Sequence, residues 1–257
     1  MLARKIPAPL IFQKHLVQML VPKRSGLKMI RLGPDGDGGY IVPDLMDGIA
    51  LCFSPGVDYH WGFESDLWDK FKIPSVMCDG SLERPKSLAP QHKYEKTWIA
   101  KRTRIGRIRL HDWVDKYSSA VTGDLILQMD IEGAEYDVLR TTPQNTLRSF
   151  RIIVVEFHGF QTMQYLVDYM FKMYPAIRKL HRDFTCVHLH PNNCSPTFSI
   201  TGVPIPMVFE ATFLRRDLLE ATVSAAGYLT EETLPEDFDC VPRNPSIRLG
   251  PDWPQFF

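Results

Sequence analysis

The sequence lacks three features: paired cysteines, long apolar runs and an excess of charge of either sign. Its 257 residues include five cysteines, an odd number at wide spacings, which argues against a disulfide framework and predicts a reducing, cytoplasmic location. No apolar stretch approaches the roughly 20 residues of a spanning helix, and the interrupted run 9–21 does not resemble a signal peptide. The 30 basic and 30 acidic side chains cancel. We therefore expect a soluble protein without a membrane span or a nucleic-acid partner.

Two phosphate-binding motifs are also missing. Neither the Gly-x-Gly-x-x-Gly spacing nor the Gly-x-x-x-x-Gly-Lys motif occurs, which argues against binding of a dinucleotide or a nucleoside triphosphate. The chain is 44% hydrophobic, enough for a sizeable core, and shows no repeat or low-complexity linker. We predict one domain over 1–257, with an N-terminal helical extension at 1–30 and a C-terminal part at 177–257 that contains antiparallel strands.

The apolar pattern alternates between short strands and helices. Helical spacing predicts helices at 10–20, 64–71, 111–117, 135–140 and 162–173. Short apolar or alternating runs predict strands at 29–32, 41–42, 49–54, 74–78, 105–110, 125–131, 151–157, 185–189 and 208–214. This order predicts an α/β fold with a mostly parallel sheet, an antiparallel C-terminal part and helices on both faces.

In open parallel sheets, ligands bind beyond the carboxyl ends of the strands, so residues just after the apolar runs are the candidates for function. Gly56 and Val57 follow one such run, and a glycine there lets a nucleoside-sized ligand approach the backbone. Asp79 follows the next run, where an acidic residue can accept hydrogen bonds from ribose hydroxyls. A tight β-turn at Gly56 and a turn or helix cap at Asp79 are the structural alternatives.

The third strand end carries the densest acidic signal. Asp130 and Glu132 close the run 125–131 and alternate onto one side of it. A carboxylate there costs desolvation unless something uses it. Glu135 is explained as a carboxylate at a helix start. The neighbouring run ends in Glu156 and His158, and a histidine can serve as a base near neutral pH.

The segment 127–139, Leu-Gln-Met-Asp-Ile-Glu-Gly-Ala-Glu-Tyr-Asp-Val-Leu, resembles the signature of the FkbM-type methyltransferases, and the resemblance extends over most of 31–159. It implies a Rossmann-like class I methyltransferase sheet and S-adenosylmethionine as the cofactor. Asp130 would lie near both the methyl donor and the acceptor. The cofactor contacts that we predict with this family in view are Asp37, Tyr40, Gly56, Val57, Asp79, Gly80, Asp112 and Asp130.

The predicted reaction is O-methylation of a hydroxyl, and a sugar or glycan as acceptor follows from the resemblance alone. Asp130, Glu156 and His158 are the predicted catalytic residues, because a hydroxyl needs a base or a metal to become a good nucleophile. Two mechanisms stay open. A divalent cation, Mg²⁺ or Mn²⁺, could be shared by Asp130 and Glu156 with His158 as base, or Asp130 or His158 could act directly.

The C-terminal part supplies the predicted acceptor side. Alternation places Cys186, His188 and His190 on one face, but their spacing is not that of a recognised zinc site. Resemblance to a segment that lies over the active site in some family members assigns His188, His190 and Asn193 to the substrate, together with Glu132. Two other functions stay open: a catalytically silent domain that binds a glycan or a protein, and a divalent-metal hydrolase that uses Asp130, Glu156 and the tail histidines.

Overall fold

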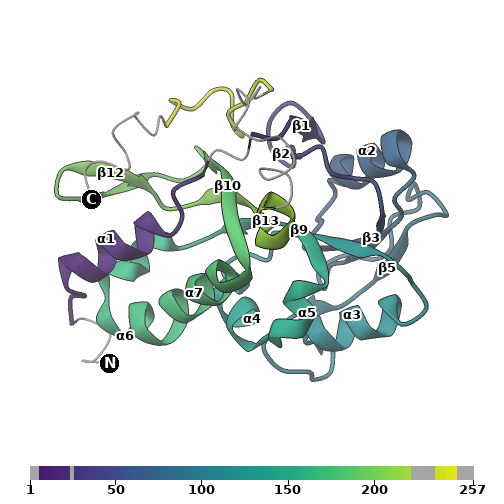
Figure 1. Ribbon diagram of the computed structural model, residues 1–257, viewed down its shortest axis with the longest axis horizontal. Helices are drawn as coiled ribbons and strands as arrows, with labels where there is room; N and C mark the ends of the chain where they lie inside the picture. Colours follow the sequence, from purple (N-terminus) through teal and green to yellow (C-terminus); the bar gives the residue numbers. More distant parts are fainter. Residues whose placement is uncertain (1–5, 24–25, 221–234, 248–257) are drawn as a thin grey trace.

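The computed structural model describes residues 6–23, 26–220 and 235–247, and a sheet of seven strands forms the centre of this described part (Figure 1). The strand order is β10-β13-β9-β8-β3-β4-β5. Neighbours from β5 through β9 run parallel, whereas β13 is antiparallel to both β9 and β10. The strands are β3 (Ile49–Pro55), β4 (Ser75–Cys78), β5 (Lys93–Glu95), β8 (Asp124–Met129), β9 (Phe150–Phe157), β10 (Phe184–Pro191) and β13 (Phe209–Arg215). The structure thus confirms a mixed α/β fold with a mostly parallel sheet.

Helices and three small two-stranded sheets surround this centre. The helical segments are α1 (Leu10–Gln18), α2 (Gly62–Phe71), α3 (Leu110–Ser118), α4 (Glu135–Thr141), α5 (Gln144–Arg148), a 3₁₀ helix η2 (Phe160–Gln164), α6 (Leu166–Asp168), a π-helical turn η3 (Tyr169–Met173) and α7 (Tyr174–Asp183). The small sheets pair β1 (Met29–Leu32) with β2 (Tyr40–Pro43), β6 (Trp98–Ile99) with β7 (Arg107–Ile108), and β11 (Thr197–Ile200) with β12 (Val203–Pro206). None of the helices in the described part is long and apolar enough to cross a bilayer.

The two faces of the central sheet pack against different partners. On one face, which we call the helical face, Leu127 and Val155 belong to a large core shared with α1, α3, α4 and α7. On the other, the hairpin face, Ile126 and Ile152 pack with the β1–β2 hairpin and α2. Strand β8 forms because its run of apolar residues is buried on both sides, as a central parallel strand requires.

The segment predicted as one helix over 162–173 is broken into three short pieces. Tyr165 is extended, with φ −102° and ψ 127°, because the N-terminal segment pairs with it: Leu166 N–H donates to Ile6 O at 2.8 Å, and Pro7 forms a bridge with Tyr165. This tertiary contact overrides the local helical pattern. Helical spacing places Met170 and Phe171 on the apolar face of the predicted helix, and this is wrong, since both side chains are exposed. A regular helix, α7, follows instead and contains Ile177, where we expected the change to alternating strands.

The predicted strand over 105–110 is reduced to β7. Gly106 adopts a φ of 68°, which turns the chain at that point, and Ile105 is fully exposed. The preceding polar region, in which we predicted no strand, contributes the edge strand β5. Both differences are local and leave the strand ends at the centre of the sheet in place.

Candidate active site

A pocket of about 300 Å³ lies at the carboxyl ends of β3, β4 and β8. The β1–β2 loop closes one side of it and the start of α2 another. Six of the predicted cofactor residues line this pocket: Asp37, Tyr40, Gly56, Val57, Asp79 and Asp130. Residues that are distant in the sequence therefore meet at the edge of the sheet, where open α/β sheets bind ligands.

Gly56 stands where two strand ends meet. Its φ is 84°, and a Cβ at this position would lie 1.5 Å from the carbonyl oxygen of Asp130, so another residue would force β3 and β8 apart. The Gly56 N–H donates to Cys78 O at 2.8 Å, which also ties the turn to β4. The glycine thus allows the three strand ends that line the pocket to approach one another.

Asp79 makes the turn contacts considered from the sequence and also lines the pocket. Its Oδ1 accepts hydrogen bonds from the N–H of Ser81 at 2.7 Å and from the Ser81 hydroxyl at 2.6 Å, which is the turn-capping arrangement. Its Oδ2 has only a long contact, 3.4 Å, from the N–H of Asp58. The carboxylate is buried and lines the pocket, so one of its oxygens retains capacity for a ligand.

Two predicted cofactor residues do not line the pocket. Gly80 packs beneath the indole of Trp98, and a Cβ on Gly80 would lie 2.1 Å from Trp98 Nε1. The glycine therefore permits Trp98, which does line the pocket, to sit at its mouth. Asp112 lies on the first turn of α3 and binds Arg109 at 2.7 Å and the Thr103 hydroxyl at 2.5 Å. These partners account for the Asp112 carboxylate.

The inner wall of the pocket holds a buried polar network that the sequence did not suggest. The Ser54 hydroxyl contacts Glu64 on α2 and Gln128 Oε1 on β8, and Gln128 Nε2 donates to the Tyr40 hydroxyl at 3.1 Å. Burial raises the pKa of Glu64 to about 7, against the opposing effect of the Ser54 hydrogen bond. The network thus links α2, two strands and the hairpin.

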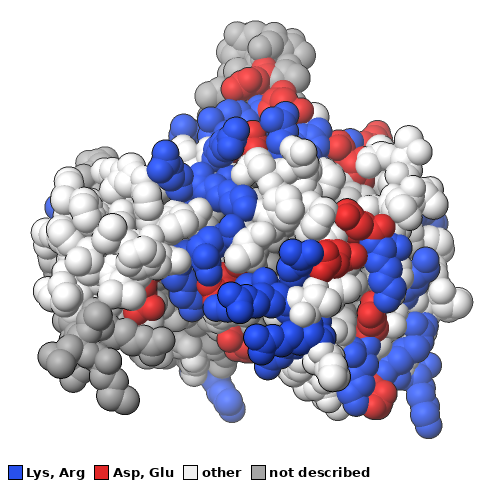
Figure 2. All heavy atoms as spheres, turned by 90° about the horizontal axis from the view of Figure 1, so that it is seen from below, with Lys and Arg blue, Asp and Glu red and all other residues white. Residues whose placement is uncertain are grey.

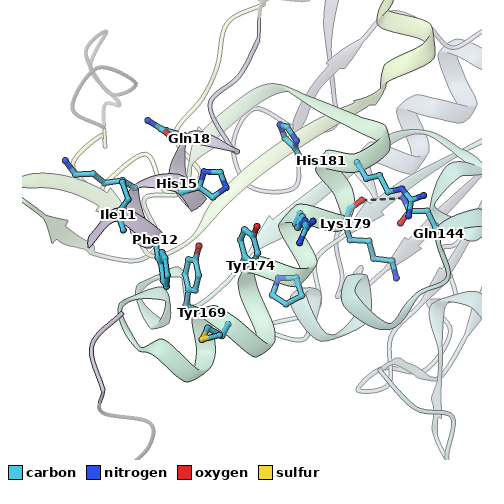
Figure 3. Close-up of a pocket in the computed structure, with 14 residues that line it drawn as sticks. Ile11, Phe12, His15, Gln18, Gln144, Tyr169, Tyr174, Lys179 and His181 are labelled. Atoms are coloured by element: carbon cyan, nitrogen blue, oxygen red, sulfur yellow. Dashed lines mark hydrogen bonds between the residues drawn. The ribbon is translucent and has the colours of Figure 1, made fainter. Parts of the chain in front are cut away.

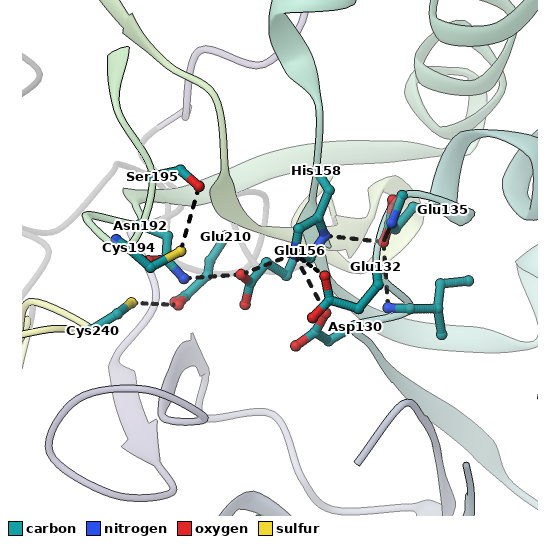
Figure 4. Close-up of polar contacts among 12 residues, drawn as sticks. Asp130, Glu132, Glu135, Glu156, His158, Asn192, Cys194, Ser195, Glu210 and Cys240 are labelled. Carbon is teal, nitrogen blue, oxygen red and sulfur yellow. Dashed lines mark hydrogen bonds and ion pairs between the residues drawn. The ribbon is translucent and has the colours of Figure 1, made fainter. Parts of the chain in front are cut away.

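Carboxyl side chains continue this polar layer across the sheet. Glu156 of β9 faces Glu210 of β13 in register, and Met129, the residue before Asp130, faces Val155, the residue before Glu156. The carboxyl groups of Asp130, Glu156 and Glu210 therefore form a row on the hairpin face (Figure 4). Glu156 and Glu210 are almost fully buried.

His158 faces this row, and Glu135 holds it from behind (Figure 4). The fully buried Glu135 Oε1 accepts hydrogen bonds from the backbone N–H of Ile131 and Gly133, and it lies 3.1 Å from His158 Nδ1. Nδ1 therefore donates to it, and Nε2 points to the acidic row. Nε2 lies 3.4 Å from Glu132 Oε2, 3.5 Å from Glu156 Oε1 and 3.9 Å from Asp130 Oδ1. Glu135 is thus more than the helix-start carboxylate that we predicted.

Burial and mutual repulsion shift the pKa values of the row upwards. Desolvation raises the pKa of Asp130 to about 7, with contributions from Glu132 and Glu135 and an opposing one from His158. Desolvation, followed by the charges of Asp130 and Glu210, raises the pKa of Glu156 to about 9. Burial lowers the pKa of His158, but the hydrogen bond to Glu135 and the surrounding carboxylates outweigh it and raise the value to about 9. Such a set favours shared protons over several free negative charges.

Several buried atoms in this cluster have no hydrogen-bond partner among the described residues. They include Asp130 Oδ1 and Glu156 Oε2. In the described part of the chain, Asp130, Glu156 and His158 form one group that offers three potential metal ligands within 4.8 Å of one another. Unpaired buried oxygens are costly, so the chemistry of this donor set suits a cation or a donor group of a ligand. The tail histidines are not part of this group.

The predicted substrate residues of the C-terminal part instead hold the segment 235–247. His188 Nε2 and His190 Nδ1 lie 3.2 Å and 2.8 Å from Asp237 Oδ2. Asn193 donates to Val241 O at 3.0 Å and accepts from its N–H at 2.8 Å. Glu132 is exposed at the turn after β8, where its φ of 54° is unusual for a residue with a side chain.

The prediction that Cys186, His188 and His190 share one face of a strand is wrong. The register of β10 against β13 shifts between Cys186 and His188, because a β-bulge places an extra residue there. Cys186 consequently packs in the core of the helical face, while His188 and His190 meet Asp237. All five cysteines are free.

Sequence reasoning missed Asn192, Glu210 and Asp237. Asn192 donates to Glu156 Oε1 at 2.9 Å, and Glu210 accepts from the Cys240 thiol at 3.1 Å. A signal existed for Glu210, since it is the one charged residue in the otherwise uncharged run 203–214. No local pattern marked Asn192 or Asp237, whose roles depend on contacts with distant segments.

A comparison with protein families adds to this geometry. A search of curated proteins found no match. Residues 78–185 match the family described as the methyltransferase FkbM domain. The match contains Asp79, Asp130 and the Glu156–His158 strand end, and it covers residues 78–159 of the resemblance read from the sequence. It confirms that resemblance over these residues: the segment 78–185 is similar to the methyltransferase FkbM domain.

Proposed function

We propose that the chain is an S-adenosylmethionine-dependent O-methyltransferase that acts on a hydroxyl group, with a sugar or glycan as the acceptor. One observation carries the proposal: the pocket lined by Gly56, Asp79 and Asp130 adjoins an acidic row with a positioned histidine. The family match at 78–185 supports a methyltransferase. The identity of the cofactor and of the acceptor goes beyond the family match and belongs to the proposal.

The pocket suits the nucleoside part of the cofactor. Oδ2 of Asp79, which has only the long contact from Asp58, can accept hydrogen bonds from ribose hydroxyls, and the indole of Trp98 at the pocket mouth can stack on a base. Gly56 lets the ligand approach the backbone, and Val57, Asp37 and Tyr40 complete the wall. The bound cofactor would supply an electrophilic methyl group.

Asp130 is the proposed general base. It lines the pocket, its Oδ1 has no hydrogen-bond partner among the described residues, and it is more accessible than Glu156. Its role is to accept the proton of the acceptor hydroxyl as the oxygen attacks. His158, held by Glu135 at Nδ1, would place a positive charge beside the acidic row and stabilise the negative charge that develops on the attacking oxygen.

The acceptor is proposed to enter from the side of Glu132 and the C-terminal segments. Glu132 is exposed next to His158. His188, His190 and Asn193 would act here by holding the segment that contains Asp237 against the sheet. Polar groups placed in this way suit a ligand with several hydroxyls.

A divalent cation, Mg²⁺ or Mn²⁺, is the second form of the mechanism. Asp130, Glu156 and His158 would hold it, and the unpartnered Asp130 Oδ1 and Glu156 Oε2 are the observations that favour it. When bound, the cation would polarise the acceptor hydroxyls. Activity that survives extensive treatment with a chelator would exclude this form.

Two measurements test the proposal. Calorimetry should detect binding of S-adenosylmethionine, and incubation with tritiated cofactor and hydroxylated acceptors should release S-adenosylhomocysteine. Glu135→Gln should lower kcat, because it weakens the hydrogen bond that positions His158. KM should change little, because Glu135 lies on the side of His158 away from the proposed acceptor. Cofactor binding without any methyl transfer would favour the silent binding domain. Turnover of a hydrolysable substrate without cofactor would favour the metal hydrolase.

A further inference from the structure

Most exposed large hydrophobic side chains gather on one side of the molecule. Among the described residues there are ten such side chains, and seven belong to two segments, 6–12 and 165–171. We call these seven the apolar patch: Ile6, Leu10, Ile11, Phe12, Tyr165, Met170 and Phe171. Ile11 and Phe171 are each 68% exposed. Folded proteins rarely leave such clusters facing water unless something covers them.

The two segments of the patch are tied together rather than adjacent by chance. The Ala8 N–H donates to Gln164 O at 2.7 Å, and the Leu166 N–H donates to Ile6 O at 2.8 Å. The rings of Phe12 and Tyr169 stack with centroids 5.4 Å apart, and Tyr169 stacks on Tyr174 at 5.5 Å. These contacts hold the two segments of the patch in a fixed arrangement.

A large groove runs from this patch along α7 (Figure 3). Its volume is about 1410 Å³, and it lies between α1 and the η3–α7 segment. Figure 3 shows Ile11, Phe12 and Tyr169 at one end, Tyr174 in the middle, and Lys179 and His181 at the other end. The groove thus has an apolar end and a cationic end.

The charge of the groove has one sign. Lys14, Arg178, Lys179 and Arg182 line it, and no aspartate or glutamate is among the described lining residues. Lys179 donates to the carbonyls of Arg140 and Thr142. The other three cations have no ion pair within the described part of the chain. A view from below shows many Lys and Arg side chains, with some Asp and Glu among them, beside an uncharged area (Figure 2).

This charge argues against a second copy of the chain as the occupant, because a two-fold interface would place equal positive charges opposite one another. An anionic amphiphile fits better, since its headgroup and its acyl carbons match the two ends of the groove. We propose that the groove and the apolar patch bind the surface of a membrane that contains anionic phospholipid. The phosphate lies at the Arg178–Arg182 end, and acyl carbons contact Ile11, Phe12 and Phe171.

This surface shares no lining residue with the cofactor pocket. Membrane binding is therefore separable from catalysis, and the proposal does not depend on the proposed function. An acidic protein segment is the competing occupant. Such a segment would pair with the cations of the groove, but its binding would not require the apolar end of the groove to insert into a lipid bilayer.

Co-sedimentation with vesicles tests the proposal directly. The full chain should sediment with phosphatidylcholine vesicles that contain phosphatidylserine, bind poorly to vesicles of phosphatidylcholine alone, and dissociate as the salt concentration rises. Absence of sedimentation with the anionic vesicles overturns the proposal. Binding of polyglutamate by the groove without vesicle binding also overturns it, in favour of an acidic protein.

Two variants separate the charged and apolar contributions. Arg178→Gln with Arg182→Gln should weaken partitioning roughly thirtyfold, given the usual contribution of a basic residue near an anionic surface. Ile11→Ser with Phe171→Ser should also release the protein from the vesicles. The matched control, Arg102→Gln with Ile105→Ser, changes an exposed cation and an exposed apolar residue on another loop and should bind like the unaltered chain.

Equal loss in the control, or no loss in either patch variant, contradicts the proposal. Light scattering supplies a further arm: if the unaltered chain is a dimer that Ile11→Ser with Phe171→Ser converts to a monomer, the patch is a self-interface and the proposal fails. Circular dichroism confirms that each variant is folded, which the exposure of all the altered side chains favours.

Discussion

The two faces of the central sheet differ in how they end. On the helical face, alternate residues stay apolar to the strand ends, as Leu127, Met129 and Phe157 do. On the hairpin face, β8 passes from Ile126 to Gln128 and then to Asp130, and β9 passes from Ile152 to Glu156. Buried carboxyl groups cost stability. The buried carboxyl groups of the hairpin face therefore lower the stability of the fold at the edge where a ligand would bind. The apolar core of the helical face compensates for this loss.

The largest expected effect comes from the polar end of the hairpin face. Asp130→Asn keeps the shape of the side chain but removes the proposed base, so methyl transfer should fall by roughly two to four orders of magnitude. The fold should persist, because the carboxyl group already has a raised pKa and gains little from ionisation. Steady-state kinetics and a thermal melt check both statements.

The matched control for this change is Asp115→Asn, which alters an exposed carboxylate on α3, outside the pocket. It should leave kcat unchanged. Retention of full activity by Asp130→Asn would remove this residue from the mechanism and leave the row with a structural role only.

A substitution in the core of the helical face should lower the stability of the fold without changing ligand binding. Phe150 is fully buried at the start of β9, far along the strand from Glu156, and packs against Phe53 with ring centroids 6.1 Å apart. Phe150→Ala should lower the free energy of unfolding by about 3–5 kcal/mol. Chemical denaturation measures this loss, while calorimetry at a temperature where the variant is folded should give an unchanged dissociation constant for the cofactor.

The hairpin face should also show a pH dependence of stability. Burial raises the pKa of Glu64 from 4.5 to about 7, so the native state holds this proton more tightly than the unfolded state does. Its contribution is complete below about pH 4.5 and is lost as the pH rises to about 7, a change of about 3 kcal/mol. Glu64→Gln keeps a neutral side chain beside Ser54 and should flatten this part of the curve. An unchanged slope between these pH values would contradict the prediction.

The smallest expected effect concerns Asp79, at the border between the turn and the pocket. Asp79→Ala removes the Oδ2 acceptor and should raise the dissociation constant of the cofactor roughly tenfold. It also removes the turn contacts to Ser81. Ser81→Ala is therefore the matched control: it deletes one of those contacts and keeps the carboxylate. Equal weakening in both variants would assign Asp79 to the turn alone.

Much of the sheet was predictable because its strands are continuous apolar runs bounded by turn residues. The runs predicted at 49–54, 74–78, 125–131 and 151–157 correspond to strands β3, β4, β8 and β9 of the central sheet. The interruption of the helix predicted over 162–173 could not be foreseen, because it results from pairing of the N-terminal segment with Tyr165. The shared face predicted for Cys186, His188 and His190 failed for a related reason: a bulge in β10 changes which side chains lie on the same face, and no residue type in the sequence indicates that bulge.

The candidate site divides in the same way. Asp130, Glu156 and His158 could be named from the sequence because polar residues at the ends of apolar runs are easy to recognise. The sequence could not show that these residues lie beside Glu135, Asn192 and Glu210. That proximity depends on the strand order and on side chains that extend from neighbouring elements. The apolar patch also depends on packing, because Met170 and Phe171 follow a helical apolar pattern yet face outward.

By itself, the sequence determined the class of fold, the strand ends that hold charged residues and the resemblance to the FkbM methyltransferases, because these depend on local order along the chain. Tertiary structure alone decided which carboxyl groups share a buried row, which atom of His158 faces it and which hydrophobic side chains stay exposed. The physical reason is that burial, pKa and pairing are properties of the space between elements, and that space exists only once the elements have packed.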